Sequence, residues 1–268
     1  MKLTPEQIEQ FDRKGYLFFP SLFSKEELAV LEAVVPEILE VERPSLTREN
    51  DRGVVRMVKG MHLYNETIRR LTRHPRVARP AEQLLGSKVY IHQTRLNLKS
   101  GLEEQPFRGY PWHQDFSTYY RVDGMMEPRA LIVAVFLDEV TACNAPLMFI
   151  PKSHRRGMIT QRNREPETDA YTQIIIHPQV IRELVEEGGI VAQLGPAGSA
   201  LFLHVSLAHA STENISPLRR AFYYLIYNSV ENECKQLTRI EHEASADFTP
   251  IAPLSDDCLL MLQSERPE

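Results

Sequence analysis

The chain has 268 residues, of which 43% are hydrophobic and 25% are charged, a composition typical of a globular protein long enough to bury a sizeable core. Its net charge of −5 offers no basic surface for nucleic acid or an anionic membrane, and no apolar run reaches the roughly 20 residues of a membrane span. The polar first residues lack a signal-peptide core, and the three separated cysteines form neither a disulfide framework nor a zinc motif, so we expect a cytoplasmic protein.

The first part of the chain, residues 1–86, is expected to be mainly helical. Thr4 and Ser24 are suitable N-cap residues, and apolar side chains repeat at helical spacing after each of them. Pro36 falls inside the second apolar pattern and predicts a kink or a break in that helix. Residues 44–53 are polar without periodicity and predict a surface loop.

From residue 88 onward the pattern changes to short strands separated by turns. Residues 88–99 alternate, so that Gln93, Arg95 and Asn97 share one face of a predicted strand. A strand face with three polar groups lies against water or against a polar cavity. Residues 130–137 are continuously apolar and predict a buried central strand.

Residues 155–176 are polar and poorly patterned, and we interpret them as a long excursion that is a candidate lid. A helical first part followed by several short strands predicts an all-β sandwich or barrel with flanking helices. We expect a single domain over 1–268, with a helical region at 1–86, a β core at 87–232 and a C-terminal extension at 233–268.

The stretch YPWHQDFSTYY, at residues 110–120, places His113 and Asp115 two residues apart. On a β-strand, residues i and i+2 project to the same face, so this pair can bind one metal from a single strand. The two side chains would be two of the three ligands of a 2-His-1-carboxylate triad, which leaves positions on iron(II) open. The H-x-D pattern alone is common, and the alternative is a His–Asp pair at the surface. A second histidine must therefore come from a distant strand.

Two later histidines, His204 and His209, are candidates for the third ligand. We favour His209, because Ser211 follows it by two residues and Arg220 by eleven, after a turn, so that a guanidinium can return beside the metal. A guanidinium is the natural partner for the distal carboxylate of an oxo-diacid. His204 lies among apolar residues and is interpreted as a core or cavity-wall histidine. Arg219 is the alternative to Arg220, but neighbours on a strand point in opposite directions and the spacing favours Arg220.

Four segments, in this order along the chain, resemble the phytanoyl-CoA dioxygenase superfamily of iron(II)- and 2-oxoglutarate-dependent oxygenases. They are VYIHQTRLNLKSG, WHQDFSTYYRVDGMMEPRA, NAPLMFIPKSHRRG and GPAGSALFLHVSLAHASTENISPLRRAFYYLIYN. Within the superfamily, the likeness is greatest to the bacterial hydroxylases of ectoine, free L-proline and free L-leucine, and it spans roughly residues 5–230.

The resemblance implies a double-stranded β-helix, which is a jelly-roll or cupin-like all-β core, with flanking helices. It also implies iron(II), 2-oxoglutarate as cosubstrate, and dioxygen. Carried over position by position, the catalytic iron ligands are His113, Asp115 and His209. The 2-oxoglutarate contacts implied in the same way are Arg220, Ser211, Asn97 and Gln93.

The chain also departs from its relatives around the substrate. Tyr119 stands where ectoine hydroxylase has a substrate-stacking tryptophan, and an inserted EEQPFRG lengthens the loop before the first iron ligand. We expect Tyr119, Tyr120 and Phe116 to form an aromatic wall, and Arg129 to meet a substrate carboxylate. The alternatives are that Phe116 packs in the core and that Arg129 pairs with an acid at the surface.

The favoured function is hydroxylation of an unactivated C–H bond in a small polar substrate, a free amino acid or a derivative of one. The presence of Asp115 favours hydroxylation over halogenation, since related halogenases lack the carboxylate ligand. One alternative is hydroxylation, desaturation or ring closure of a larger natural-product intermediate. Another is a non-catalytic jelly-roll binding module, which is less favoured because no ligand position is lost. The expected partner is a small molecule, not nucleic acid or a membrane, and the pattern leaves monomer and homodimer open.

Overall fold

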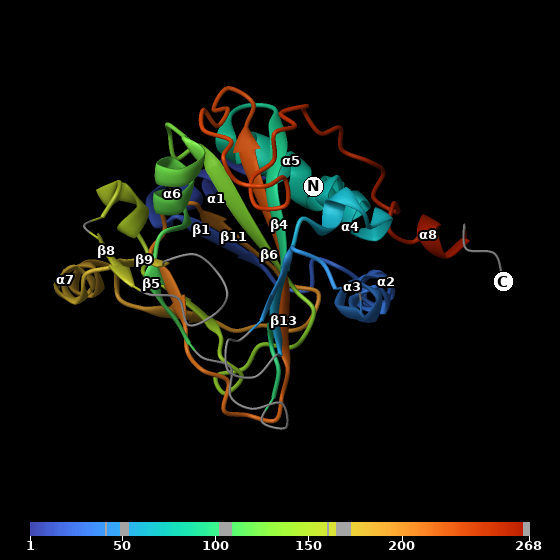
Figure 1. Cartoon of the computed structure of the whole chain (residues 1–268), viewed down its shortest axis with the longest axis horizontal. Helices are drawn as coiled ribbons and strands as arrows, with labels where there is room; N and C mark the ends of the chain where they lie inside the picture. The colour runs from blue at the N-terminus through green and yellow to red at the C-terminus, as the bar shows by residue number, and fades with distance from the viewer. Residues whose placement is uncertain (41, 49–53, 102–108, 160, 165–172, 265–268) are drawn as a thin grey trace.

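The computed structural model describes residues 1–40, 42–48, 54–101, 109–159, 161–164 and 173–264, and its core consists of two antiparallel sheets (Figure 1). In these residues the larger sheet has the strand order β1 (Tyr16–Phe19), β11 (Ala200–His204), β6 (Ala130–Phe136), β13 (Arg220–Ser229), β4 (Val89–Lys99), β3 (Val55–Lys59) and β2 (Leu46–Arg48). The smaller sheet has the order β10 (Val191–Gln193), β7 (Leu147–Phe149), β12 (His209–Ser211) and β5 (Tyr110–His113). Neighbouring strands come from distant parts of the chain, as in a double-stranded β-helix, so the predicted all-β core is confirmed.

The N-terminal helices form where their caps predict them. Thr4 and Ser24 each make a capping box, opening α1 (Pro5–Lys14) and α2 (Lys25–Ala33). The break expected at Pro36 is confirmed, because α2 ends before it and α3 (Val35–Glu40) begins beside it. Helices α4 (Glu66–Thr72) and α5 (Pro75–Leu85) follow, and α5 packs on β4, β6 and β13. In Figure 1, α2, α3 and α4 lie on the side of the larger sheet that faces away from β5.

Strand β6 is buried along its whole length between β11 and β13, which confirms the central strand predicted from its continuous apolar run. Two tyrosines of β13 tie the sheet to the helices. The Tyr223 hydroxyl donates to the Leu31 carbonyl oxygen (3.1 Å), and the Tyr227 hydroxyl donates to the Thr72 carbonyl oxygen (2.8 Å). These bonds satisfy polar groups that burial would otherwise leave unpaired.

The helical prediction for the first 86 residues is wrong over β2 and β3, which extend the larger sheet. The predicted surface loop at 44–53 is likewise partly wrong, because Leu46–Arg48 forms β2 and residues 49–53 lie outside the described part of the chain. The physical reason is pairing: β3 binds the edge of β4, with Met57 opposite Asn97 and Lys59 opposite Arg95. Pairing with a strand that is distant in the sequence leaves little signal in the amino-acid sequence of a short segment.

The expected excursion at 155–176 contains regular structure. A short 3-10 helix, η4 (Ser153–Arg156), overlaps its start, and β8 (Gln161–Arg164) pairs with β9 (Gln173–Ile176) before α7 (Pro178–Gly188). Residues 160 and 165–172 lie outside the described part of the chain, and the lid remains a prediction. The remaining elements are η1 (Met61–Leu63), α6 (Asp115–Thr118), η3 (Tyr119–Asp123) and α8 (Met261–Ser264). Among the described helices, none combines the length and apolar character needed to cross a bilayer.

Candidate active site

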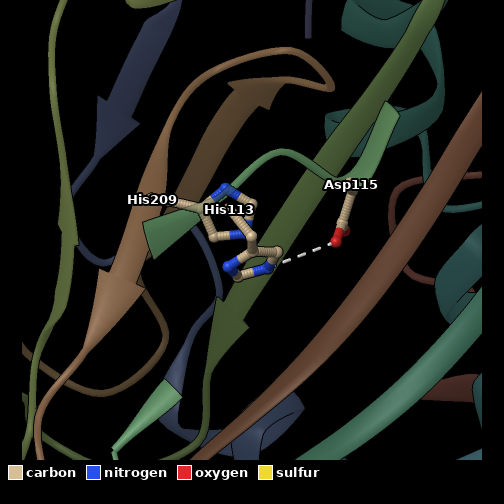
Figure 2. A group of neighbouring side chains, drawn as sticks. All are labelled: His113, Asp115 and His209. Atoms are coloured by element: carbon tan, nitrogen blue, oxygen red, sulfur yellow. Dashed lines mark ion pairs between the residues drawn. The ribbon is translucent and has the colours of Figure 1, made fainter. Parts of the chain in front are cut away.

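Three side chains converge between the two sheets. His113 ends β5, Asp115 begins α6, and His209 begins β12, directly opposite His113 in the register of the smaller sheet. Their ligand atoms all lie within 4.8 Å of one another, and His113 Nε2 is 3.5 Å from Asp115 Oδ1 (Figure 2). This is the group of two imidazoles and one carboxylate that the sequence predicted.

The prediction that His113 and Asp115 share a strand is wrong in detail. Strand β5 ends at His113, and Asp115 is the first residue of a short helix. The intervening Gln114 is still extended (φ −121°, ψ 129°), so the two-residue alternation carries over to Asp115. The Gln114 amide fixes this turn: its nitrogen donates to the Ser206 carbonyl oxygen (2.6 Å), and its oxygen accepts from the Ile159 N–H (3.0 Å).

The backbone sets the tautomer of both histidines. The Nδ1–H of His113 donates to the Pro111 carbonyl oxygen (2.8 Å), and that of His209 donates to the Leu207 carbonyl oxygen (2.9 Å). A carbonyl only accepts, so in the neutral ring each Nδ1 carries the proton and each Nε2 keeps a lone pair. Both rings therefore present a metal-binding nitrogen to the space that they share with Asp115.

The electrostatics favour the metal-binding protonation states. Burial by itself raises the pKa of Asp115, but the charge of Arg95, with His113 and His209, outweighs burial and holds that pKa well below its usual value. Burial, followed by the neighbouring His113, lowers the pKa of His209 to about 4. Near neutral pH the site therefore presents a carboxylate at Asp115 and a neutral imidazole at His209, which are the forms that ligate a divalent metal.

The cavity beside the triad is lined from both sheets. Besides His113, Asp115 and His209, its walls contain Arg56, Met57, Lys59, Arg95, Asn97, Tyr110, Ile132, Leu147, Leu203, Ala210, Ser211, Arg220 and Tyr224. Three of the four residues predicted to contact 2-oxoglutarate are among them. The cavity thus joins the triad, an apolar wall and several cations in one space.

Arg220 is buried, with 1% of its surface exposed, and reaches the cavity from β13. Its Nε donates to the Ala145 carbonyl oxygen (3.1 Å), and one terminal nitrogen donates to Asn97 Oδ1 (3.2 Å). Burial lowers the pKa of Arg220 to about 10, so the guanidinium stays charged. Arg219 points away and pairs with Asp138 (2.8 Å) at the surface, in agreement with the strand parity expected from the sequence.

Gln93 shares the inward face of β4 but does not line the cavity. Its side-chain oxygen accepts from Arg95 Nε, and its nitrogen donates to the Glu243 carbonyl oxygen (2.6 Å). Gln93 therefore lies behind Arg95, and its contact with 2-oxoglutarate stays a prediction.

The structure does not form the predicted aromatic wall. Phe116 packs in the hydrophobic core, and Tyr120 is 40% exposed. Tyr119 is buried, and its hydroxyl contacts Arg95 and lies 3.5 Å from Asp115 Oδ2. The chain turns helical at Asp115, so the directions of these rings follow a helix and not a strand. Arg129 does not line the cavity either: it pairs with Glu231 (2.8 Å), the alternative left open above.

His204 lies outside the triad. Its Nδ1 accepts from the Ser206 N–H (3.1 Å), and its ring centroid is 5.0 Å from that of His154. Burial, followed by the charge of His154, lowers the pKa of His204 to about 3. It is a neutral packing residue, as expected.

Sequence reasoning missed several cavity residues. Arg95 and Tyr224 had a usable signal, since each lies on the inward face of a recognised strand, two residues from Asn97 and four from Arg220. Arg56 had no such signal. Thr47 pairs with Met57 and Arg48 pairs with Val55, so Arg56 is the extra residue of a β-bulge. The bulge turns its side chain towards the cavity. The inserted loop that precedes His113 falls mostly on residues 102–108, outside the described part of the chain.

Comparison with known proteins agrees with this geometry. Ectoine dioxygenase of Bordetella bronchiseptica is 37% identical over 241 residues, covering 86% of this chain and 77% of the relative. L-proline trans-4-hydroxylase of Streptomyces griseoviridis is 33% identical over 259 residues, covering 93% and 96%. The crystal structure of EctD from S. alaskensis with 2-oxoglutarate and 5-hydroxyectoine superposes with a TM-score of 0.82 at 32% identity, covering 94% of this chain and 87% of that one.

A family comparison gives the same result over most of the sequence. The pattern of the phytanoyl-CoA dioxygenase (PhyH) family matches residues 11–222, which include the whole triad and Arg220. The chain therefore belongs to the phytanoyl-CoA dioxygenase family.

Proposed function

We propose that this protein hydroxylates an unactivated C–H bond of a small polar substrate, a free amino acid or an amino-acid derivative. It is an iron(II)- and 2-oxoglutarate-dependent dioxygenase. The observation that carries the proposal is the convergence of His113, Asp115 and His209 beside a cavity that also contains Arg220. The relatives named for ectoine and L-proline support the substrate class, and EctD structures exist with iron and with 2-oxoglutarate.

His113, Asp115 and His209 would hold the iron, and the donor set fits it: two imidazole nitrogens freed by their backbone bonds, and one ionised carboxylate. When bound, iron(II) with 2-oxoglutarate and dioxygen supplies the oxidation of a C–H bond, with succinate and carbon dioxide as coproducts. The protein's own residues bind the reactants, orient them and exclude water.

Arg220 is placed to bind the distal carboxylate of 2-oxoglutarate. Its guanidinium is charged and buried, and Asn97 and the Ala145 carbonyl oxygen fix its orientation. Ser211, two residues after His209 on β12, adds a hydroxyl to the same cavity. The cosubstrate would thus extend between the triad and β13.

The apolar part of the cavity excludes water from the reacting carbon. Ile132, Leu147 and Leu203 come from three strands of the two sheets and face the same space as the triad. A C–H bond that lies against these side chains would be shielded from water.

The test is succinate formation from 2-oxoglutarate and iron(II), first alone and then with a panel that includes L-proline, L-leucine and ectoine. The proposal predicts that at least one small amino-acid-like compound stimulates turnover well above the uncoupled rate. If none does, and only a larger scaffold stimulates turnover, the substrate class is wrong. If iron and 2-oxoglutarate give no turnover under any condition, the protein is a binding module.

We propose that the enzyme works in the cytoplasm on a freely diffusing small molecule, without nucleic acid. The net charge of −5 supports the last point, because a phosphate backbone would be repelled.

A further inference from the structure

The C-terminal segment after β13 is docked against the back of the active site. The Lys235 N–H donates to the Gly124 carbonyl oxygen (3.2 Å), and the Ser245 N–H donates to the His92 carbonyl oxygen (3.0 Å) on β4. Gly60 has φ of +66°, and a Cβ added there would overlap His242, so the segment also packs closely against the end of β3. The match to the family ends at residue 222, before this segment begins.

This segment contributes two partly buried charged residues to a chain of ion pairs, called the ladder, that leads to the buried Asp123 and Lys59. Arg239 Nε donates to Asp123 Oδ1 (2.7 Å), and a terminal nitrogen of Arg239 donates to Glu243 Oε2 (2.9 Å). His92 Nε2 lies 3.2 Å from Asp123 Oδ2 at one end of the ladder. At the other end, Glu243 Oε1 forms an ion pair with the Lys59 ammonium.

Lys59 is the point at which the ladder reaches the cavity. It lies on β3 directly opposite Arg95 on β4, and both side chains line the cavity beside the triad. Only 4% of the Lys59 surface is exposed. Burial lowers the pKa of Lys59, and the charge of Glu243 opposes that shift.

Burying an ammonium costs free energy, because the charge loses its hydration. Replacing a buried ion pair by apolar groups of similar volume is often neutral or stabilising, so the fold alone does not need this charge. Glu243 favours the charged form of Lys59 and holds the ammonium at the cavity wall, and Arg239 and Asp123 continue the chain of ion pairs behind Glu243. An ammonium has three N–H donors, so one that lines a cavity can bind an anionic group of a ligand as well as a carboxylate of the protein.

The anion that Lys59 meets differs from the distal carboxylate of 2-oxoglutarate. Arg220 pairs with Lys99 on β4, whereas Lys59 pairs with Arg95, four residues further along the same strand. At about 3.4 Å per residue the backbone positions of the two residues are about 14 Å apart along β4. Lys59 therefore lies at the level of Arg95, which pairs with Asp115, and Arg220 begins at a different level of the cavity wall.

We propose that Lys59 is a substrate-binding residue that takes a carboxylate of the substrate, and that Glu243 and Arg239 are positioning residues that hold its ammonium in place. The inference rests on the proposed function and narrows it: the substrate has a carboxylate, and the segment after β13 contributes to its recognition.

The experiment uses the full chain with iron(II) and 2-oxoglutarate, and compares Lys59→Met with Lys59→Arg and with the exposed control Lys88→Met. The probes are the carboxylates of the panel above and the matching carboxamides, such as L-proline and L-prolinamide. Turnover gives KM and kcat, and anaerobic calorimetry gives binding without chemistry. Loss of one charge-assisted hydrogen bond predicts a roughly ten- to hundred-fold rise in KM and Kd for the carboxylate in Lys59→Met. Lys59→Arg should recover part of this loss, and Lys88→Met should match the wild type.

Glu243→Gln tests the positioning role, with the exposed Glu233→Gln as its matched control. The expected result is a higher KM for the carboxylate, in the same direction as Lys59→Met but smaller, with unchanged kcat and unchanged KM for 2-oxoglutarate. A purely structural role would lower the melting temperature and leave the preference for acid over amide intact, and that outcome overturns the assignment of Glu243.

The two levels of the proposal fail in different ways. A wild-type enzyme that no carboxylate of the panel stimulates overturns the proposed function and Lys59 with it. A wild-type enzyme that prefers the acid, together with a Lys59→Met variant that keeps the same KM and the same preference, overturns the role of Lys59 alone. Equal use of acid and amide by the wild type has the same consequence.

Discussion

Two arginines, Arg76 partly exposed and Arg220 buried, lie in two regions of the molecule and show how differently the same group can be used. Under the N-terminal helices, Arg76 donates to both carboxylate oxygens of Glu27 (2.8 and 2.9 Å) and of Asp256 (2.9 and 2.8 Å), and to the Leu22 carbonyl oxygen (2.8 Å). In the cavity, Arg220 donates to Asn97 Oδ1 and to the Ala145 carbonyl oxygen. Both of these acceptors are neutral.

The difference separates stability from function. The protein neutralises the charge of Arg76 and uses its donors fully, and the result links α2, α5 and the C-terminal tail. Arg220 is oriented by two neutral acceptors and by the Phe222 ring, whose centroid lies 4.4 Å from its Cζ, which leaves the guanidinium able to bind an incoming carboxylate. Substitutions in the first region should therefore change the free energy of unfolding, and those in the second should change kinetic constants.

The largest effect is expected at the triad. Asp115→Ala removes one of the three proposed iron ligands and the carboxylate that neutralises Arg95 (3.3 Å). Changes to groups that merely support a metal ligand cost 10- to 100-fold, so loss of a ligand should reduce iron-dependent succinate formation by roughly a hundred-fold or more. Circular dichroism should show a retained fold. Full activity in this variant would mean that the ligand set is wrong.

The next effect concerns stability alone. Arg76→Met leaves Glu27 buried, at 2% exposure, without its guanidinium partner. Breaking a buried ion pair typically costs about 3–5 kcal/mol of unfolding free energy, which denaturant titration can measure. The control Arg129→Met breaks a more exposed pair and should cost less than about 1 kcal/mol. If Arg76→Met instead raised KM for 2-oxoglutarate in a folded enzyme, the separation of the two regions would fail.

Arg220→Met should give the reverse result. Loss of a charge-assisted bond to a carboxylate predicts a roughly ten- to hundred-fold higher KM for 2-oxoglutarate, with little change in unfolding free energy. Steady-state kinetics and thermal melting of the same preparation provide both numbers. Arg219→Met, which breaks only surface pairs, should keep the wild-type KM. A loss in Arg219→Met and not in Arg220→Met would show that the functional guanidinium is the other one.

The smallest effect is the pH dependence of the Arg76 region. Burial by itself raises the pKa of Glu27, but bonds to His74, Arg76 and the Ser24 N–H outweigh it and lower the pKa to about 2, from 4.5. A depressed carboxyl pKa contributes stability that is present above pH 4.5 and is lost as the pH falls towards 2. Denaturant midpoints across that window should fall less steeply in Glu27→Gln than in the wild type. Parallel slopes for the two proteins would show that Glu27 is not the group that titrates.

The sequence predicted the parts of the site that depend on local spacing. Asp115 and Arg220 were placed by two-residue alternation, and an extended Gln114 preserves that alternation even where β5 ends. The predicted aromatic wall does not form, because Phe116 and Tyr119 lie in helical turns, where two-residue alternation no longer applies. The contribution of Lys59 could not be foreseen, since it depends on the pairing of β3 with β4 and on the docking of a distant segment.

The direct opposition of His113 and His209 across β5 and β12 has a consequence for how the protein acquires its metal. Nearly a hundred residues of chain must be ordered before the two imidazoles meet, so an unfolded polypeptide offers a metal only a local fragment of the site. With His113 and His209 as the proposed ligands, we expect uptake of iron to be a late event in maturation and the bound ion to favour the folded state by mass action. A destabilised variant would lose its metal because the strands separate, even when all three ligands are unchanged.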